Sequence, residues 1–306
     1  MFMRHLKNLN INSELEAEEF VKQCEAEFSR DLDEAIEHVF DVEDVKIITL
    51  SGPTCSGKTT TATKLTERID NSGKNAVMLS IDDFFFGRTD RNIVDDDGEA
   101  PDYDSVKAID LDYLEEFTAD LLKGKRVRVP KFDFLEAKRT GYEEYEPDPK
   151  DIYIYEGIQA VYPEVTSLFG GNYRSIYIRL DEDVEYKGVV LDRDELRFLR
   201  RIVRDYKYRN ATAEFSFHLW QTVRSNEEKN IFPYAKSDVY INSFLPYEPF
   251  IISHYAIDVL KTVPADSQYR DEADALIEKL RVFDNPYFSD RMVPDNSVFR
   301  EFIGPR

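Results

Sequence analysis

The sequence has few cysteines: Cys24 and Cys55 are the only two among 306 residues, so no disulfide framework can form. A chain without such a framework suits a reducing compartment. The sequence also lacks an apolar run of membrane-spanning length, and residues 1–7 lack the apolar core of a signal peptide. We therefore expect a soluble, cytoplasmic protein with no membrane partner.

Positive charge is scarce as well. The chain has 40 Lys and Arg against 61 Asp and Glu, a formal net charge of −21. Because nucleic-acid-binding surfaces are basic, we expect no nucleic-acid partner. Hydrophobic residues, by contrast, make up 42% of the chain, which is enough to bury a full core.

Apolar residues recur near helical spacing over residues 13–40 and predict a helical N-terminal extension, 1–44, made of one helix or two. Its apolar face is expected to pack on the main domain or on a second subunit, and the second case would make a homo-oligomer. A further helix over 266–282 and an irregular tail form a C-terminal part, 264–306.

Between these parts, residues 45–263 alternate strand and helix patterns, which is typical of a parallel α/β sheet. The predicted strands are 45–51, 76–81, 152–156, 175–180 and 238–242, and the predicted helices are 58–70, 109–123, 195–208, 212–229 and 249–262. We further expect an edge strand at 127–134, because Pro130 interrupts it, a surface loop at 88–104 and a charged connection at 142–150.

The first predicted strand leads directly into a phosphate-binding motif. Residues 52–59 match G-x-x-x-x-G-K-[ST] in full, and a predicted helix follows. Such glycines let successive backbone amides point at one anion, the lysine reaches the outer phosphates, and the hydroxyl after it binds Mg²⁺. The residues expected to bind a nucleoside triphosphate are Gly52, Pro53, Thr54, Cys55, Ser56, Gly57, Lys58, Thr59 and Thr60. With the alternating pattern, the motif predicts a three-layer α/β/α P-loop NTPase fold with a mostly parallel sheet.

Two carboxylates end predicted strands at the same edge of this sheet. Asp82 follows the second strand, where a carboxylate can accept the proton of an attacking hydroxyl or simply cap the next segment. Glu156 ends the strand 152–156, where P-loop proteins carry an acidic residue near Mg²⁺, unless it is an ordinary strand-terminal acid.

A basic segment interrupts the acidic chain between Arg197 and Arg209. It carries six Lys and Arg, with Asp205 as the single acid within it. Arginines at helical spacing can grip phosphate oxygens, so we interpret 194–230 as a helical lid over the nucleotide; the alternative is a solvated helix face. Two partial matches to GTPase motifs, at 95–98 and 235–238, lack the flanking strands that such motifs need.

With these segments in order, the chain resembles the uridine kinase / phosphoribulokinase family of P-loop small-molecule kinases over about residues 46–245. The resemblance is strongest at 200–209, followed by Glu214, Trp220, 230–233 and 237–238. Residues 293–304 resemble the C-terminus of a bacterial uridine-kinase-like subgroup.

The resemblance implies ATP and Mg²⁺ as cofactors and assigns roles position by position. Asp82 matches the catalytic base, Asp104 the acid that holds the ribose hydroxyls, and Glu156, with Thr59, the metal site. The arginines that match lid residues in contact with phosphates or acceptor are Arg201, Arg204 and Arg209, so the catalytic set is Asp82, Lys58, Arg201 and Arg204.

The acceptor side departs from the family pattern. Uridine kinases carry a Tyr and a His that bind the pyrimidine edge, and this chain has Phe132 and Ala137 at those positions. The family's tyrosine after the catalytic segment is also replaced, by Phe85. With Phe134, these residues predict apolar contacts to the acceptor. The lid glycine is Asn210, which tolerates a left-handed backbone.

Three functions therefore remain open from the sequence. The first is phosphorylation of a nucleoside 5′-hydroxyl. The second is phosphorylation of a sugar phosphate or another metabolite, with Lys131, Lys138 and Arg139 as candidate contacts. The third is a nucleotide-binding regulatory protein without catalysis.

Overall fold

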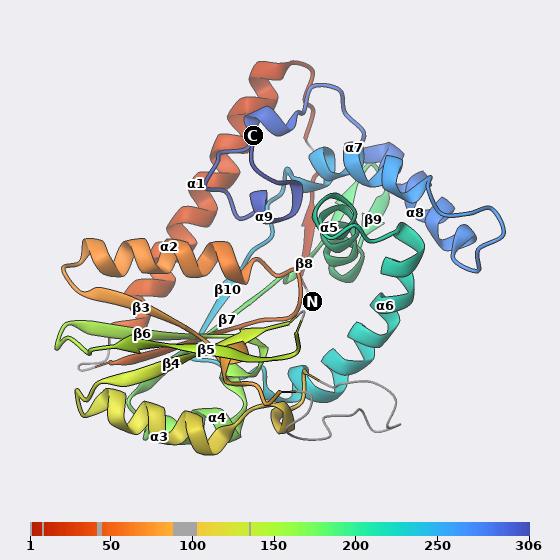
Figure 1. Ribbon diagram of the computed structural model, residues 1–306. Coiled ribbons are helices and arrows are strands. Elements are labelled where there is room, and N and C mark those ends of the chain that lie inside the picture. The colour runs from red at the N-terminus through yellow and green to blue at the C-terminus, as the bar shows by residue number, and fades with distance from the viewer. Residues whose placement is uncertain (1, 8, 42–44, 88–102, 135) are drawn as a thin grey trace.

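A five-stranded parallel sheet lies at the centre of the fold (Figure 1). The computed structural model describes residues 2–7, 9–41, 45–87, 103–134 and 136–306. The strand order is β10-β7-β2-β6-β3, and every neighbouring pair is parallel. The strands are β2 (Ile47–Ser51), β3 (Asn75–Ser80), β6 (Asp151–Glu156), β7 (Tyr173–Arg179) and β10 (Val239–Asn242). All five predicted strands are confirmed, with ends that differ by one or two residues.

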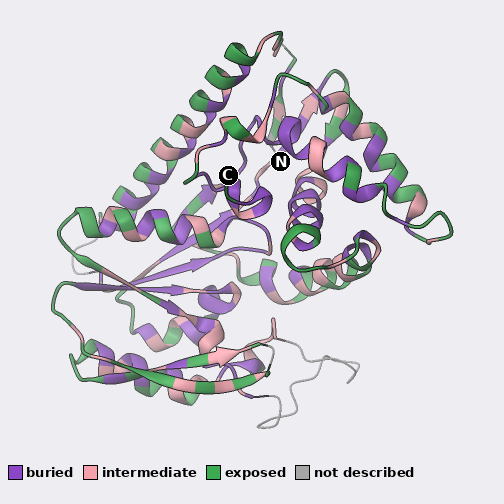
Figure 2. Ribbon diagram, turned by 45° about the horizontal axis from the view of Figure 1, so that its top comes forward, coloured by how far each residue is buried: buried purple, intermediate pink, exposed green. Residues whose placement is uncertain are grey.

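Helices cover both faces of this sheet. Figure 1 places α2 (Lys58–Asn71) on one face and α3 (Leu111–Leu122) with the short α4 (Pro163–Thr166) on the other. The pleat sends successive residues to opposite faces. Ile152 and Ile154 join one hydrophobic core, while Tyr153 and Tyr155 join the other. The predicted three-layer α/β/α fold is confirmed, and its central strands are buried (Figure 2).

The N-terminal extension is one long helix, α1 (Glu14–Val39), which begins at the N-cap Ser13. Its buried residues include Val21, Phe28 and Leu32, which lie in the same core as one face of the sheet. The apolar face predicted over 13–40 therefore packs on this chain's own domain.

The C-terminal half adds five helices to the same core. They are α5 (Arg193–Tyr208), α6 (Ala213–Asn226), α7 (Glu248–Leu260), α8 (Arg270–Phe283) and α9 (Arg300–Ile303), with a π-helical turn at Glu227–Ile231. Residues of α1, α5, α7, α8 and α9 share one core cluster. The division at 44 and 263 stays a prediction, but the flanking parts pack with the middle one.

A small second sheet escaped the sequence prediction. It joins β1 (Phe2–His5), β8 (Glu182–Tyr186) and β9 (Val189–Leu191). β1 pairs in parallel with β8, which lies almost 180 residues further along the chain. Strands of three to five residues carry too little pattern to be recognised alone.

One connection was predicted wrongly. The edge strand at 127–134 is present as β4 (Val127–Asp133), but it pairs with β5 (Lys138–Tyr145), so the first residues of the predicted connection 142–150 are strand. β5 is largely solvent-exposed and polar, which hid it from a search for apolar alternation. Most of the predicted loop 88–104, including the motif match at 95–98, lies outside the described residues. Within the described part of the chain, no helix is long and apolar enough to cross a membrane.

Candidate active site

The phosphate-binding motif forms the turn between β2 and α2. Gly57 precedes α2 with a positive φ of 90°, and an added Cβ there would collide with Val298. A Cβ at Gly52 would collide with the carbonyl oxygen of Ile178 on β7. Both glycines are therefore needed for this loop to curl at the carboxyl edge of the sheet.

The lysine of the motif, Lys58, is hydrogen-bonded to the backbone of the loop. Lys58 Nζ donates to the carbonyl oxygens of Gly52 and Pro53 at 2.9 and 3.1 Å. Thr59 is exposed at the first turn of α2, where backbone amides lack intrahelical partners. This combination of a cation and amides at a helix N-terminus is suited to binding phosphate.

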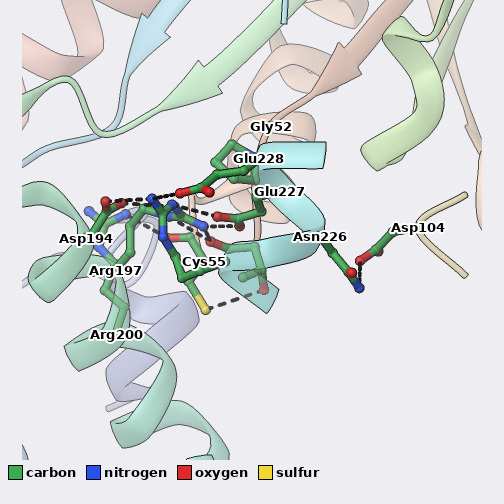
Figure 3. Close-up of polar contacts among 12 residues, drawn as sticks. Gly52, Cys55, Asp104, Asp194, Arg197, Arg200, Asn226, Glu227 and Glu228 are labelled. Atoms are coloured by element: carbon green, nitrogen blue, oxygen red, sulfur yellow. Dashed lines mark hydrogen bonds and ion pairs between the residues drawn. The ribbon is translucent and has the colours of Figure 1, made fainter. Parts of the chain in front are cut away.

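Two arginines of α5 bind backbone oxygens of the same loop (Figure 3). Arg197 donates through Nε and Nη2 to Thr54 O at 3.2 and 3.1 Å and also pairs with Glu227. Arg200 is fully buried; it pairs with the equally buried Glu248 at 2.6 Å and donates to Cys55 O at 3.2 Å. These two arginines thus hold the backbone of the loop through its carbonyl oxygens.

The three predicted phosphate-contacting arginines gather around one carboxylate. Arg201, Arg204 and Arg209 all pair with Asp205, at 3.4, 2.7 and 3.5 Å. Burial and the neighbouring Arg204 charge lower the pKa of Arg209. One acid therefore balances three cations, and the cluster keeps an excess of positive charge.

Helix α5 itself is firmly packed. Nine of its 16 residues are buried, and it contacts α6, α7 and α9. Asn210, where the lid glycine was expected, has a φ of 53°, as predicted for a left-handed turn residue. That 194–230 moves as a lid stays a prediction; α6, with three buried residues, is the less anchored of its two helices.

Asp82 lies at the centre of the acidic side of the site. It follows β3 in the 3₁₀ turn Ile81–Phe84, and its charged neighbours are Glu156, Lys58, Asp83 and Asp104. Burial, with the charge of Glu156, raises the pKa of Asp82 to about 7. A carboxylate with this pKa is well matched to proton transfer near neutral pH.

The adjacent acid, Asp83, forms a structural hydrogen bond. Asp83 Oδ1 accepts the backbone amide of Phe132 at 2.9 Å and so ties β4 to the 3₁₀ turn. Asp83 thus has a structural contact, whereas Asp82 has Glu156 and Lys58 among its charged neighbours.

Glu156 and Thr59 line one cavity of about 290 Å³ between α2 and β3. Burial raises the pKa of Glu156, and the charge of Lys58 opposes that rise. A carboxylate and a hydroxyl are the oxygen ligands that Mg²⁺ takes alongside nucleotide phosphates and water. The residues fit the ion on this basis, although no group of three or more His, Cys, Asp or Glu side chains that could hold a metal by themselves occurs in the described ranges.

Asp104, which is predicted to bind the acceptor, is linked to the predicted lid segment. Its carboxylate accepts from Asn226 Nδ2 at the end of α6, at 3.3 Å (Figure 3). Tyr162 donates to its backbone oxygen at 2.9 Å. Sequence reasoning missed Asn226, since a single Asn at a helix end carries no distinctive pattern.

Four aromatic rings form a cluster beside Asp82 and Asp104. Phe85, Tyr103, Phe132 and Phe134 lie with their ring centroids 5.1 to 6.3 Å apart. Phe134 is 58% exposed, so this ring remains open to a ligand. The hydroxyl of Tyr103 is buried and has no hydrogen-bond partner within the described residues. The sequence predicted the two Phe residues but missed this polar group.

The three cations suggested for a sugar phosphate are already paired. Lys131 pairs with Glu143, Lys138 with Glu136, and Arg139 with Asp110 at 3.0 Å. Arg139 also donates to Phe84 O. The acceptor side therefore has no surplus of positive charge from these residues.

A further cavity, of about 280 Å³, is lined by residues of the P-loop, β7, α5 and α6. Arg179, Arg193, Arg197 and Arg224 line it together with Pro53. Three of these arginines also pair with neighbouring acids, among them Asp181 and Asp194. The partial motif match at 235–238 is structural, because Asp238 binds Ser175 and Arg174 of β7.

The central part of the chain matches a known protein family. The model of the phosphoribulokinase / uridine kinase family matches residues 47–245. A uridine kinase of Staphylococcus epidermidis is 31% identical over 191 residues, which cover 62% of this chain and 83% of that protein. Uridine-cytidine kinase C of Dictyostelium discoideum is 25% identical over 151 residues, 47% of this chain; the match spans only 31% of that longer relative.

The chain is also similar to solved structures, at low sequence identity. One described as a possible uridine kinase from Bacillus stearothermophilus covers 71% of this chain and 100% of its own, at 15% identity and a TM-score of 0.46. D-glycerate 3-kinase from Cryptococcus neoformans covers 70% of this chain and 88% of its own, at 15% identity and a TM-score of 0.41.

Proposed function

Because the chain belongs to the phosphoribulokinase / uridine kinase family, we propose that it transfers the γ-phosphoryl group of ATP to the 5′-hydroxyl of a nucleoside. Transfer is direct and in line, and it needs a base for the acceptor hydroxyl, a cradle for the triphosphate and cations at the transferring group.

The observation that carries this proposal is the environment of Asp82. Its pKa of about 7 and its position near Lys58 and Glu156 suit a base that takes the hydroxyl proton next to the phosphate site. A carboxylate that only capped the following segment would gain nothing from a buried position beside a second acid.

The donor side supplies binding and charge. The backbone N–H groups of the P-loop and Lys58 bind the phosphates, while Thr59 and Glu156 are the residues that would hold Mg²⁺. When bound, this ion neutralises charge on the phosphate oxygens. Arg201, Arg204 and Arg209 stabilise the charge that develops on the transferring group.

The acceptor side supplies orientation. Asp104 can accept hydrogen bonds from ribose hydroxyls, and Phe132 and Phe134 offer faces for stacking of a planar base. The pairing of Lys131, Lys138 and Arg139 with acids favours an uncharged acceptor over a sugar phosphate.

A test is an ADP-release assay with Mg²⁺ and ATP across nucleosides and phosphorylated sugars. We expect acceptor-dependent ADP release with at least one nucleoside, and its loss in Asp82→Asn. Release with ribulose 5-phosphate alone would move the acceptor to the sugar phosphates. No acceptor-dependent release with any compound, despite ATP binding, would favour a regulatory protein.

A further inference from the structure

The C-terminal tail, residues 293–306, lies beyond the matched family region and packs directly on the P-loop and on α5 (Figure 1). Val298, Phe299 and Phe302 are fully buried. The ring of Phe302 lies 4.6 Å from the guanidinium of Arg200. Lys207 and Tyr208, at the end of α5, donate to Ile303 O at 2.8 and 2.9 Å. The tail is thus a fixed part of the structure beside the phosphate-binding loop.

Hydrogen bonds within the C-terminal segment also fix the conformation of the tail. The Arg300 guanidinium donates to the backbone oxygens of Asp290 and Val293 at 2.6 Å and of Gly304 at 3.1 Å. These bonds fix the backbone on both sides of Glu301, the next residue along the chain. The short helix α9 therefore presents the Glu301 side chain at a defined place.

That place is the first turn of α2. One oxygen of Glu301 lies 3.4 Å from the backbone nitrogen of Thr60 and 3.5 Å from its hydroxyl oxygen. Thr60 belongs to the expected phosphate-binding set, and its amide is among those at a helix N-terminus that lack an intrahelical partner. The carboxylate therefore takes up a donor that a nucleotide phosphate would otherwise use.

The charges around Glu301 make its position easy to change. Arg204, from the three-arginine cluster, attracts it, whereas Glu156 across the site repels it. The two contacts to Thr60 are long, and the side chain of Glu301 is only partly buried. A phosphate at this turn would repel the carboxylate, and Arg204 offers it a second partner.

We propose that Glu301 is a built-in competitor of the nucleotide, which holds the Thr60 amide in the free protein and lowers the affinity for ATP. The proposal rests on the proposed function, because the ligand it concerns is the phosphate chain of ATP. The C-terminal tail then belongs to the nucleotide site and sets the ATP concentration at which the enzyme works.

The experiment is a calorimetric measurement of the Kd for ATP in the wild-type chain and in three full-length variants. A competitor that occupies its site nine-tenths of the time weakens apparent affinity about tenfold. We therefore expect Glu301→Gln to lower the Kd for ATP about 3- to 10-fold. Asp295→Asn is the matched control: it removes the same charge from the same tail, at an exposed residue that pairs with Arg306, and should leave the Kd unchanged.

Glu301→Asp separates contact from distant charge. It keeps the charge but shortens the side chain, so competition for the amide predicts a Kd near that of Glu301→Gln, whereas repulsion at a distance predicts the wild-type value. A Glu301→Gln variant that melts at the wild-type temperature and binds ATP no more tightly than Asp295→Asn would overturn the proposal. Weaker binding would overturn it too, since Glu301 would then assist the nucleotide. Wild-type protein that binds no ATP would overturn the proposed function itself, and this inference with it.

Discussion

The proposed donor and acceptor sides of the site are built differently. On the donor side, the P-loop carbonyls are bonded to buried arginines, and the tail packs against Gly57. On the acceptor side, four aromatic rings surround few polar groups, and Phe134 is largely exposed. The donor side is thus rigid and specified by many polar bonds, whereas the acceptor side depends mainly on shape and apolar contact.

This difference explains why the nucleotide is easier to infer than the acceptor. A phosphate group needs amides and cations in one arrangement, and that arrangement leaves a motif in the sequence. An aromatic pocket accepts many planar ligands, because apolar contact discriminates weakly between them. The following predictions test the comparison, from the largest expected effect to the smallest.

Replacing Asp82 should abolish function on the acceptor side while leaving the donor side intact. We expect Asp82→Asn to lower kcat about 10²- to 10⁴-fold, because the acceptor hydroxyl loses its base, with the Kd for ATP unchanged. Asp83→Asn is the control, since Asn can still accept the Phe132 amide, and it should retain most of the activity. Equal losses in the two variants would contradict the assignment; steady-state kinetics and calorimetry give the answer.

On the donor side, the largest effect should be on stability. Arg200→Ala leaves Glu248 buried without its partner, and breaking such a pair costs about 3–5 kcal/mol of unfolding free energy. The control is Arg209→Ala, because Arg209 is the C-cap of the same helix and its side chain is 61% exposed. This variant should change the unfolding free energy by less than about 0.5 kcal/mol. Urea unfolding measures both, and similar values for the two would contradict the rigid donor side.

The raised pKa of Asp82 predicts a pH dependence of stability. In the unfolded chain its pKa returns to about 4, so between about pH 4 and pH 7 the folded protein keeps a proton that the unfolded chain releases. Stability from this group is complete below that window and is lost as pH rises to about 7, by up to roughly 4 kcal/mol.

The Asp82→Asn variant cannot release this proton. The unfolding free energy of the variant minus that of the wild type should therefore be larger at pH 8 than at pH 5. Urea unfolding at the two pH values measures this difference. An equal difference at the two pH values would show that Asp82 titrates as an ordinary carboxyl.

Removing the exposed ring of the aromatic cluster should affect only the acceptor. We expect Phe134→Ala to raise KM for the acceptor about 3- to 10-fold, as expected for loss of an aromatic contact, with KM for ATP unchanged. Because Phe134 is 58% exposed, the melting temperature should barely change. A parallel rise in both KM values would mean that the two sides are not independent.

The smallest effect concerns the one buried hydroxyl of the cluster. Tyr103→Phe should raise KM for an acceptor that bonds this hydroxyl about threefold, the value of a neutral hydrogen bond of roughly 0.7 kcal/mol. If the variant is instead more stable and its KM is unchanged, the hydroxyl forms no hydrogen bond with the acceptor.

Much of the fold could be predicted, because the central strands and their helices have strong periodic patterns. The five strands of the main sheet and the helices over 58–70 and 195–208 were found within two residues at each end. The sheet of β1, β8 and β9 was missed, since β1 and β8 are far apart in the sequence and all three strands are too short to show a recognisable pattern. The polar strand β5 was missed because its partner, not its own pattern, makes it a strand.

The candidate site was predictable to the extent that its residues belong to motifs. Lys58, Thr59, Asp82 and Glu156 come together at one edge of the sheet, as their positions after strands implied. Asn226 and Tyr103 could not be found, because nothing near them in the sequence reveals their partners. Arg200, one of the six cations of the basic segment, is a buried contact of the P-loop, which nothing in the sequence indicated.

The sequence by itself determined the phosphate-binding loop, the parallel sheet and the class of chemistry, because each depends on residues close together in the chain. Only the tertiary structure decided which charges meet. It directs Arg197 and Arg200 to the loop carbonyls, gathers three arginines on Asp205, and brings Glu301 to Thr60 from 241 residues away. Such contacts form when separate elements pack into one core, and no local pattern records them.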